Sequence, residues 1–158
     1  MKTNAARILD GLHIPYELRD YDPGDEHLTA AEVAARVSLP PEQVWKTLVV
    51  RGDKHGVAIA VIAAKSELDP KALAKLTGDR KVEPVALKEV TPLTGYVRGG
   101  VTALACKKDH PVWVDEMMTL HDRVAVSAGI RGTQIVLAPE DYLRATNGTA
   151  GPIARDPV

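Results

Sequence analysis

Residues 47–63 read TLVVRGDKHGVAIAVIA, and this stretch decides the fold. It holds two apolar runs rich in β-branched residues, Thr47 to Arg51 and Val57 to Ala63, on either side of a short polar segment. That segment, Gly52 to Gly56, has the length of a hairpin loop and a glycine at each end, where tight turns favour glycine. The sequence therefore predicts a β-hairpin near the middle of the chain.

Helices are predicted on both sides of the hairpin from their capping signals. Thr29 and Glu32 form a capping box, because a hydroxyl and a carboxylate at this spacing bind free amide groups of the first helical turn. Asp69 followed by Pro70 marks another helix start, and Gly78 marks its end. The predicted helices cover residues 4–12, 30–37 and 70–77, and a last helix begins at Pro139.

Short strands are predicted elsewhere from β-branched and apolar residues between turn signals. They cover residues 14–18, 80–83, 112–115, 123–127 and 134–137. Strands and helices do not alternate regularly, so a doubly wound parallel sheet is not expected. The sequence predicts an α+β fold in one domain, residues 1–158, with a mixed, mostly antiparallel curved sheet or partial barrel and peripheral helices.

Composition limits the class of protein. A chain of 158 residues that is 45% apolar and 26% charged fits one soluble globular domain. No apolar run reaches the length that spans a bilayer, and the single cysteine, Cys106, allows no internal disulfide. We therefore expect a cytoplasmic protein without a membrane partner. With a net charge of -1, it is not expected to bind DNA, and it would bind RNA only through a local basic patch.

The common motifs of catalysis are missing from the sequence. Its five histidines lack the spacing of metal-binding motifs, and it has neither a phosphate-binding glycine loop nor a GxSxG nucleophile motif. We therefore expect no metal and no cofactor. Cys106 follows an apolar run, where a small core residue is commoner than a nucleophile, so the core interpretation is favoured.

Lys46 stands out because it lies within an apolar run. Strand alternation places it on the same face as Leu48 and Val50, so it either extends along apolar surface to the solvent or points into a functional pocket. Two glycine-rich segments, 96–100 and 127–132, are the other candidates for a site. Each could bring backbone amides close to a ligand, and each could equally be an ordinary tight turn.

Several segments together resemble the YbaK/EbsC family. They are Lys2–Ala5, Trp45–Leu48, Thr94–Gly100, Lys107–Lys108 and Val126–Ile135. Their order and spacing extend the resemblance over nearly the whole chain. It implies an aminoacyl-tRNA editing domain that removes a wrong amino acid, cysteine, from tRNA(Pro). It also implies a metal-free cleavage in which the cysteinyl thiol attacks its own ester and leaves as a thiolactone.

The resemblance assigns roles to particular residues as well. Lys46 matches the family lysine and is expected to be catalytic, by holding the substrate and stabilising developing negative charge. Tyr21 matches a tyrosine near the terminal adenosine. The other expected substrate contacts are Gly99, Gly100, Ser127, Ala128 and Gly129, while Arg98 and Arg131 either contact phosphates or serve as surface charges. The acceptor end of tRNA(Pro) is the implied partner, and prolyl-tRNA synthetase is the second candidate partner.

Three positions depart from the family pattern. Ala103 and Ala105 stand where a proline and a glycine are usual, which predicts a different path for this loop. Gln134 stands where some members carry an acidic residue, and an amide does not titrate. Beside a cysteinyl-tRNA deacylase, two interpretations therefore stay open: a deacylase for another small amino acid, and a non-catalytic relative that binds tRNA or a protein.

Overall fold

The computed structural model describes residues 2–25 and 28–157. Its α-helices are α1 (Asn4–Gly11), α2 (Ala30–Val37), α3 (Pro70–Thr77), α4 (Leu87–Thr94) and α5 (Pro139–Thr146). Its strands are β1 (Glu17–Asp20), β2 (Trp45–Gly52), β3 (Gly56–Ala63), β4 (Glu67–Leu68), β5 (Val82–Pro84), β6 (Val112–Asp115), β7 (Val124–Ser127), β8 (Thr133–Leu137), β9 (Thr149–Gly151) and β10 (Ala154–Arg155). Two short 3-10 helices cover Pro41–Gln43 and Glu116–Leu120.

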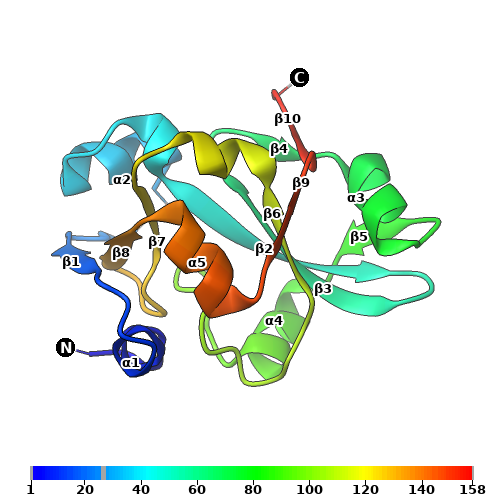
Figure 1. The fold of residues 1–158 in the computed structure, drawn as a ribbon, viewed down its shortest axis with the longest axis horizontal. Helices are drawn as coiled ribbons and strands as arrows, with labels where there is room; N and C mark the ends of the chain where they lie inside the picture. The colour runs from blue at the N-terminus through cyan, green and yellow to red at the C-terminus, as the bar shows by residue number, and fades with distance from the viewer. Residues whose placement is uncertain (1, 26–27, 158) are drawn as a thin grey trace.

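The predicted hairpin is the centre of a five-stranded sheet. Strands β2 and β3 pair antiparallel along their whole length, from Trp45 opposite Ala63 to Gly52 opposite Gly56. The sheet has the order β5-β2-β3-β6-β9, with β5 antiparallel to β2, and with β6 and β9 joined in parallel. In Figure 1 the helices lie around these strands, which confirms the predicted α+β class with a mixed sheet and peripheral helices.

A second sheet continues the first. It has the order β1-β8-β7, and all its pairs are antiparallel. A parallel bridge between Val44 and Ala125 connects its β7 edge to the beginning of β2. The two sheets thus form one curved surface that does not close into a barrel, in agreement with the partial barrel predicted from the sequence.

The central strand β3 is buried on both faces, and this accounts for its apolar sequence. Ile59 and Val61 point into the largest core cluster, together with apolar residues of α1, β6, β7, β8 and α5. Ala60 and Ile62 point to the opposite face, where α3 covers them. A strand buried on both faces is apolar throughout instead of alternating between apolar and polar residues. Residues 57–63 show this apolar pattern, from which the strand was predicted.

Several predicted boundaries differ from the structure by one to three residues, and hydrogen bonds give the reasons for three of them. The first helix ends at Gly11, and the strand expected at 14–18 begins at Glu17, because the Ile14 amide still bonds the helix at the Leu9 carbonyl and Pro15 has no amide to donate. The strand expected at 80–83 begins at Val82. The amides of Arg80 and Lys81 donate to the Asp53 carboxylate instead of a strand.

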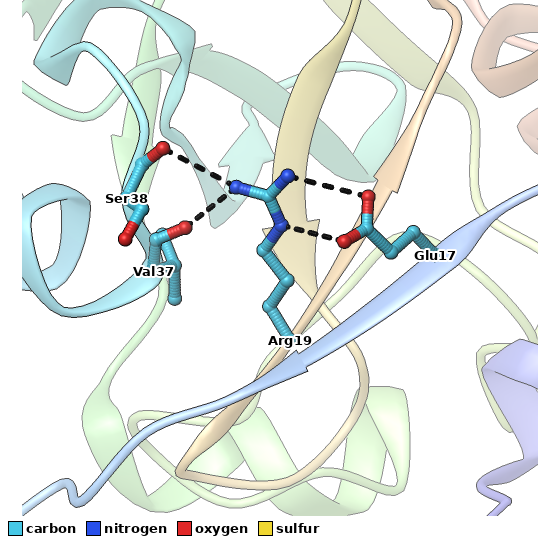
Figure 2. A network of polar contacts seen from close by, with 4 residues as sticks. All are labelled: Glu17, Arg19, Val37 and Ser38. Carbon is cyan, nitrogen blue, oxygen red and sulfur yellow. Dashed lines mark hydrogen bonds and ion pairs between the residues drawn. The ribbon is translucent and has the colours of Figure 1, made fainter.

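Helix α2 is fixed against β1 by Arg19, as Figure 2 shows. The guanidinium donates to the carbonyl oxygens of Val37, at 2.6 Å, and Ser38, at 3.3 Å, which end the helix. Its other nitrogens form a two-point ion pair with Glu17. A cation is favourable at a helix C-terminus, where carbonyl groups lack helical partners. Arg19 therefore holds the helix that covers one face of the second sheet.

Candidate functional site

A cavity of about 760 Å³ lies where β2 lacks a neighbouring strand. On one side β2 pairs with β3 throughout, but on the other side β5 pairs only with residues 50–52 and β7 is bridged only to Val44. Among the described residues, no strand covers the edge of residues 45–48 between these two points. The cavity is lined by Val44 to Val49, so it occupies this gap in the curved sheet.

Segments far apart in the sequence complete the walls. They come from the stretch that follows β1, from α2, from the end of β3, from α4, from the loop after Tyr96, and from the turn between β7 and β8. Beyond residues 44–49 the lining residues are Tyr21, Pro23, Leu28, Thr29, Ala30, Ala31, Val33, Ala64, Lys65, Leu87, Val90, Arg98, Gly99, Val101, Ser127, Arg131 and Gln134. The cavity is therefore largely apolar with a few polar groups, which is typical of a ligand site.

Sheet register brings three polar residues to the same face. Val44 and Ala125 are bridged side by side, so Lys46 and Ser127, each two positions further along its strand, point to the same side as they do. Ser127 in turn pairs with Gln134 of β8. All three line the cavity. The unbroken pairing of β2 with β3 keeps Lys46 on the face of Leu48 and Val50, as the alternation argument predicted.

Lys46 is partly buried and holds no partner within the described residues. Its ammonium makes neither a hydrogen bond nor an ion pair there, although the negative charge of Glu67 acts on it. Burial lowers the pKa of Lys46 below the ordinary lysine value, and Glu67 opposes this shift. A partly desolvated cation that faces a cavity is available to bind an anionic or carbonyl group of a ligand.

The described cavity lining carries positive charge without any carboxylate. Lys46 is joined by the exposed side chains of Lys65, Arg98 and Arg131, and no Asp or Glu is among the described lining residues. This contrasts with the net charge of -1 for the whole chain. Sequence reasoning missed Lys65. The position of Lys65 could have indicated its role. It follows the end of β3, and the last residue of β3, Ala63, pairs with Trp45, the residue before Lys46.

Arg131 also builds the cavity wall. Its guanidinium donates to the carbonyl oxygens of Pro23, at 3.4 Å, and Gly24, at 3.3 Å. The Tyr21 amide donates to the Gly132 carbonyl at 2.8 Å. These bonds hold the segment after β1 against the β7–β8 turn, so Tyr21 is positioned at the cavity by the same turn that carries Arg131.

The predicted substrate contacts divide into two groups. Tyr21, Gly99 and Ser127 line the cavity, and the Ser127 hydroxyl accepts a hydrogen bond from the Gly129 amide at 3.1 Å. Ala128, Gly100 and Gly129 do not line it. Ala128 is fully buried in the core, while the two glycines lie where the loop after Tyr96 packs against the β7–β8 turn. Their binding of substrate stays a prediction, and their visible role is structural.

The loop with the two unusual alanines keeps a glycine-like conformation. Ala105 has a φ of 54°, in the left-handed region that glycine adopts most readily. The Tyr96 hydroxyl donates to the carbonyl oxygens of Leu104, at 2.6 Å, and Ala105, at 3.2 Å. Ala103 is buried in the core. The alanine at 105 thus does not exclude the backbone conformation that a glycine at this position would take.

This conformation predicts that Ala105→Gly stabilises the protein. Relief of left-handed strain is worth about 1–2 kcal/mol, and the greater freedom of glycine in the unfolded chain offsets part of it. We expect the free energy of unfolding to rise by about 0.5–1 kcal/mol, measured by urea denaturation. Ala103→Gly, in the same loop but without a positive φ, is the control and should destabilise. A loss of stability in Ala105→Gly would contradict the strain.

Cys106 lies outside the cavity lining, and its environment favours a structural role. The thiol donates to the Thr102 carbonyl at 3.3 Å, and burial raises the pKa of Cys106 to about 11. A thiol with this pKa is protonated at neutral pH and is a weak nucleophile. Within residues 2–25 and 28–157, no three His, Cys, Asp or Glu side chains are grouped to hold a metal ion; His27 lies outside these residues.

Residues 25–145 match the model of the aminoacyl-tRNA editing domain family. The chain belongs to this family. A curated relative of the editing domain from Enterococcus faecalis, named as a candidate Cys-tRNA(Pro)/Cys-tRNA(Cys) deacylase, EbsC, is 42% identical over 147 residues. The match covers 93% of this chain and 90% of that protein. The family resemblance read from the sequence is thereby confirmed.

Solved structures share the fold of the editing domain. A crystal structure described as a candidate trans-editing enzyme for prolyl-tRNA synthetase has a TM-score of 0.83 and 23% identity, over 98% of this chain and 99% of its own. A second, described only as a hypothetical protein, has a TM-score of 0.86 and 23% identity, over 97% of this chain and 100% of its own. In the described part of the editing domain, no helix is long and apolar enough to cross a bilayer.

Proposed function

We propose that this editing domain is a trans-editing deacylase that clears cysteine from mischarged Cys-tRNA(Pro). The 42% identity to a relative named for Cys-tRNA(Pro) and Cys-tRNA(Cys) supports the substrate. The observation that carries the proposal is Lys46, a partly buried cation without a partner among the described residues, in a cavity whose described lining holds three further cations and no carboxylate. This site suits the phosphates and the ester carbonyl at the end of an aminoacyl-tRNA.

The cleavage we propose uses the thiol of the substrate. The cysteinyl thiolate attacks its own ester carbonyl, a carbon–sulfur bond forms, and the bond from the carbonyl carbon to the ribose oxygen breaks. The ribose oxygen takes up a proton, and the amino acid leaves as a thiolactone. Lys46 stabilises the negative charge that develops on the carbonyl oxygen and supplies a proton donor close to the leaving oxygen. The protein needs no nucleophile of its own, because orienting an intramolecular attack can supply a large rate increase.

Other parts of the cavity fit the end of the tRNA. Tyr21 presents an aromatic ring on which the terminal adenine can stack, and apolar side chains of α2 and α4 surround the rest. Lys65, Arg98 and Arg131 line the cavity, and their positive charge supports a role in binding phosphates of the tRNA. Because the whole chain carries a net charge of -1, we further propose that prolyl-tRNA synthetase helps to deliver the tRNA.

The experiment compares three esters on tRNA(Pro): cysteinyl, seryl and alanyl. The serine side chain replaces sulfur with oxygen, so it matches cysteine in shape and lacks the reactive thiolate. We expect the cysteinyl ester to be cleaved at least about 100-fold faster than either of the others, with release of the thiolactone. Added chelator should not change the rate.

Other outcomes would favour the alternatives. Equal or faster cleavage of the alanyl ester would keep a deacylase but exclude the thiol mechanism. Loss of activity with chelator, restored by zinc, would exclude a metal-free reaction. No turnover of any ester, together with binding of the tRNA, would favour a non-catalytic relative.

A further inference from the structure

Gln134 presents a hydrogen-bond acceptor without a partner at the cavity. The residue lies on β8, its side chain is among those that line the cavity, and only 7% of it is exposed. Its amide oxygen, Oε1, is buried and accepts no hydrogen bond from any described residue. Leaving a buried polar atom unpaired costs free energy, so native proteins rarely keep one without a use.

Three other buried polar atoms also lack partners within the described residues, but they are elsewhere. They are Oε1 of Gln43, Oγ1 of Thr102 and the hydroxyl of Tyr142, although the electrostatics of Tyr142 include an interaction with the Thr47 side chain. None of these residues is part of the cavity lining. Gln134 alone in this group combines burial, an unpaired acceptor and a position at the cavity, which indicates that a ligand supplies the missing donor.

The charges around the cavity indicate which group of an aminoacyl ester would donate a hydrogen bond to Gln134. Carbonyl and phosphate oxygens are attracted to the four cations of the wall, Lys46 among them. The α-ammonium group is repelled by these cations, and as a donor it needs an acceptor. The Ser127 hydroxyl already accepts a bond from the Gly129 amide, and the described lining offers no carboxylate. Gln134 differs from the other lining residues because its buried amide oxygen accepts no bond at all from the described residues, so a donor on the ligand would remove the cost of leaving it unpaired.

We propose that Oε1 of Gln134 binds the α-ammonium group of the aminoacyl ester and so acts as a specificity-determining residue. This inference rests on the proposed function and identifies the group that orients its substrate. Held at the ammonium by Gln134 and at the carbonyl by Lys46, the amino acid cannot rotate about its Cα. Both contacts come from one face of the sheet. The site consequently requires a free amino group and rejects aminoacyl esters that lack one.

An amide suits this position better than a carboxylate would. An uncharged acceptor can bind the ammonium without forming an ion pair with the cations of the wall, and the amide itself stays in the same state at every pH. A carboxylate at 134 would be attracted to Lys46 or Arg131 and would compete with the substrate for them. The absence of titration at Gln134 is thus compatible with a binding role, although it excludes a proton-transfer role.

The test compares two substrates and one variant. The substrates are cysteinyl-tRNA(Pro) and its desamino analogue, 3-mercaptopropionyl-tRNA(Pro), which retains the thiol and the ester. In the wild type, we expect kcat/KM to be about 10- to 100-fold higher for the cysteinyl ester, since a hydrogen bond to a charged group contributes to this extent. Gln134→Met keeps the length of the side chain and removes the acceptor. It should lower kcat/KM for the cysteinyl ester to the level of the analogue and leave the analogue unchanged.

Other results would overturn the proposal. Equal loss on both substrates would mean that Gln134 supports the structure and does not recognise the amine. A wild type that treats both esters alike would exclude amine recognition altogether. Gln134→Met should unfold at the same temperature as the wild type or higher, since it removes a buried unpaired amide, and this controls for folding.

A binding measurement separates this proposal from the proposed function. The probes are two stable amides of 3′-amino-3′-deoxyadenosine, one cysteinyl and one 3-mercaptopropionyl, titrated by calorimetry. If the domain cleaves no ester, the proposed function fails, but tighter binding of the cysteinyl compound that is lost in Gln134→Met would still support amine recognition. Equal binding of the two compounds by the wild type would contradict it, whatever the activity.

Discussion

Replacing Lys46 with alanine is expected to lower kcat/KM for cysteinyl-tRNA(Pro) about 100- to 1000-fold, which is the usual loss when one donor to a developing oxyanion is removed. The free energy of unfolding should stay the same or rise. The Lys46 ammonium is partly buried and has no hydrogen bond or ion pair with described residues, so the fold loses no contact of this kind. Single-turnover cleavage and urea denaturation measure the two quantities.

Lys65→Ala is the matched control for this variant. Lys65 carries the same charge at the same cavity, but it is exposed and follows the strand end. We expect it to weaken binding less than about 10-fold and to leave the single-turnover rate at saturation unchanged, because a phosphate contact is equally strong before and during the reaction. Equal losses in the two variants would show that the cavity needs only positive charge, and would remove the special role of Lys46.

The pH profile gives the same hypothesis a second readout. The reaction needs a thiolate, whose fraction rises with pH around the usual thiol pKa of about 8.5, and it needs the Lys46 ammonium. Because burial lowers the pKa of Lys46, the ammonium is lost at a lower pH than in an ordinary lysine. The enzyme-dependent rate should therefore rise and then fall. In Lys46→Arg, assayed on the desamino ester 3-mercaptopropionyl-tRNA(Pro) so that no substrate ammonium titrates, any remaining activity should keep the rise without the fall, because a guanidinium stays charged.

Local sequence signals predicted the parts of the fold that depend on a few neighbouring residues. Helix α2 begins with the capping box of Thr29 and Glu32 as expected. Helix α3 begins at Pro70, directly after its N-cap Asp69, and ends at Thr77, before the C-cap Gly78, which has a φ of 86°. The β2–β3 hairpin extends the predicted runs by one or two residues. Hydrogen bonds within one turn or one hairpin specify each of these elements, so a short stretch of sequence is enough to predict them.

Helix α4 was not predicted, although two of its side chains line the cavity. Pro92 lies inside it and removes one helical hydrogen bond, which argues against a helix in any reading of the sequence. The available signals were Glu89, whose carboxylate accepts from the Ala86 amide, and Gly95, which ends the helix with a φ of 84°. Packing of Val90 against the main core compensates for the weak local preference.

The cavity itself depends on pairings between distant segments. Its gap exists because β7 reaches β2 only at Val44 and β5 reaches it only from Val50 onward. The sequence identified Lys46, Tyr21 and Ser127 through a family resemblance, and the alternation of β2 placed Lys46 on the correct face. It could not place Gln134 and Ser127 beside Lys46, because the register that joins β2 to β7 is set by tertiary packing rather than by local preference.

Gly129→Ala is expected to lower the free energy of unfolding by about 2–3 kcal/mol. Gly129 has a φ of 100°, and a Cβ there would lie 2.8 Å from the ring of Tyr96. That ring is buried and anchored by the bond from its hydroxyl to the Leu104 carbonyl, so it cannot move aside freely. Urea denaturation gives the stability, and the same variant should also lose deacylase activity, because displacing Tyr96 moves the loop that carries Gly99 to the cavity.

Gly56→Ala separates the two causes. Gly56 has a φ of 80°, but a Cβ at this position meets no atom within 4 Å. Gly56→Ala therefore has the cost of a positive φ without a steric clash of the Cβ. We expect its free energy of unfolding to fall by about 1 kcal/mol and its activity to stay normal. The difference between the two variants measures how tightly the loop after Tyr96 packs against the β7–β8 turn. If both variants lose the same free energy of unfolding, the positive φ alone accounts for the cost, and the two segments can move apart. A rigid cavity wall would then not be what orients the aminoacyl group.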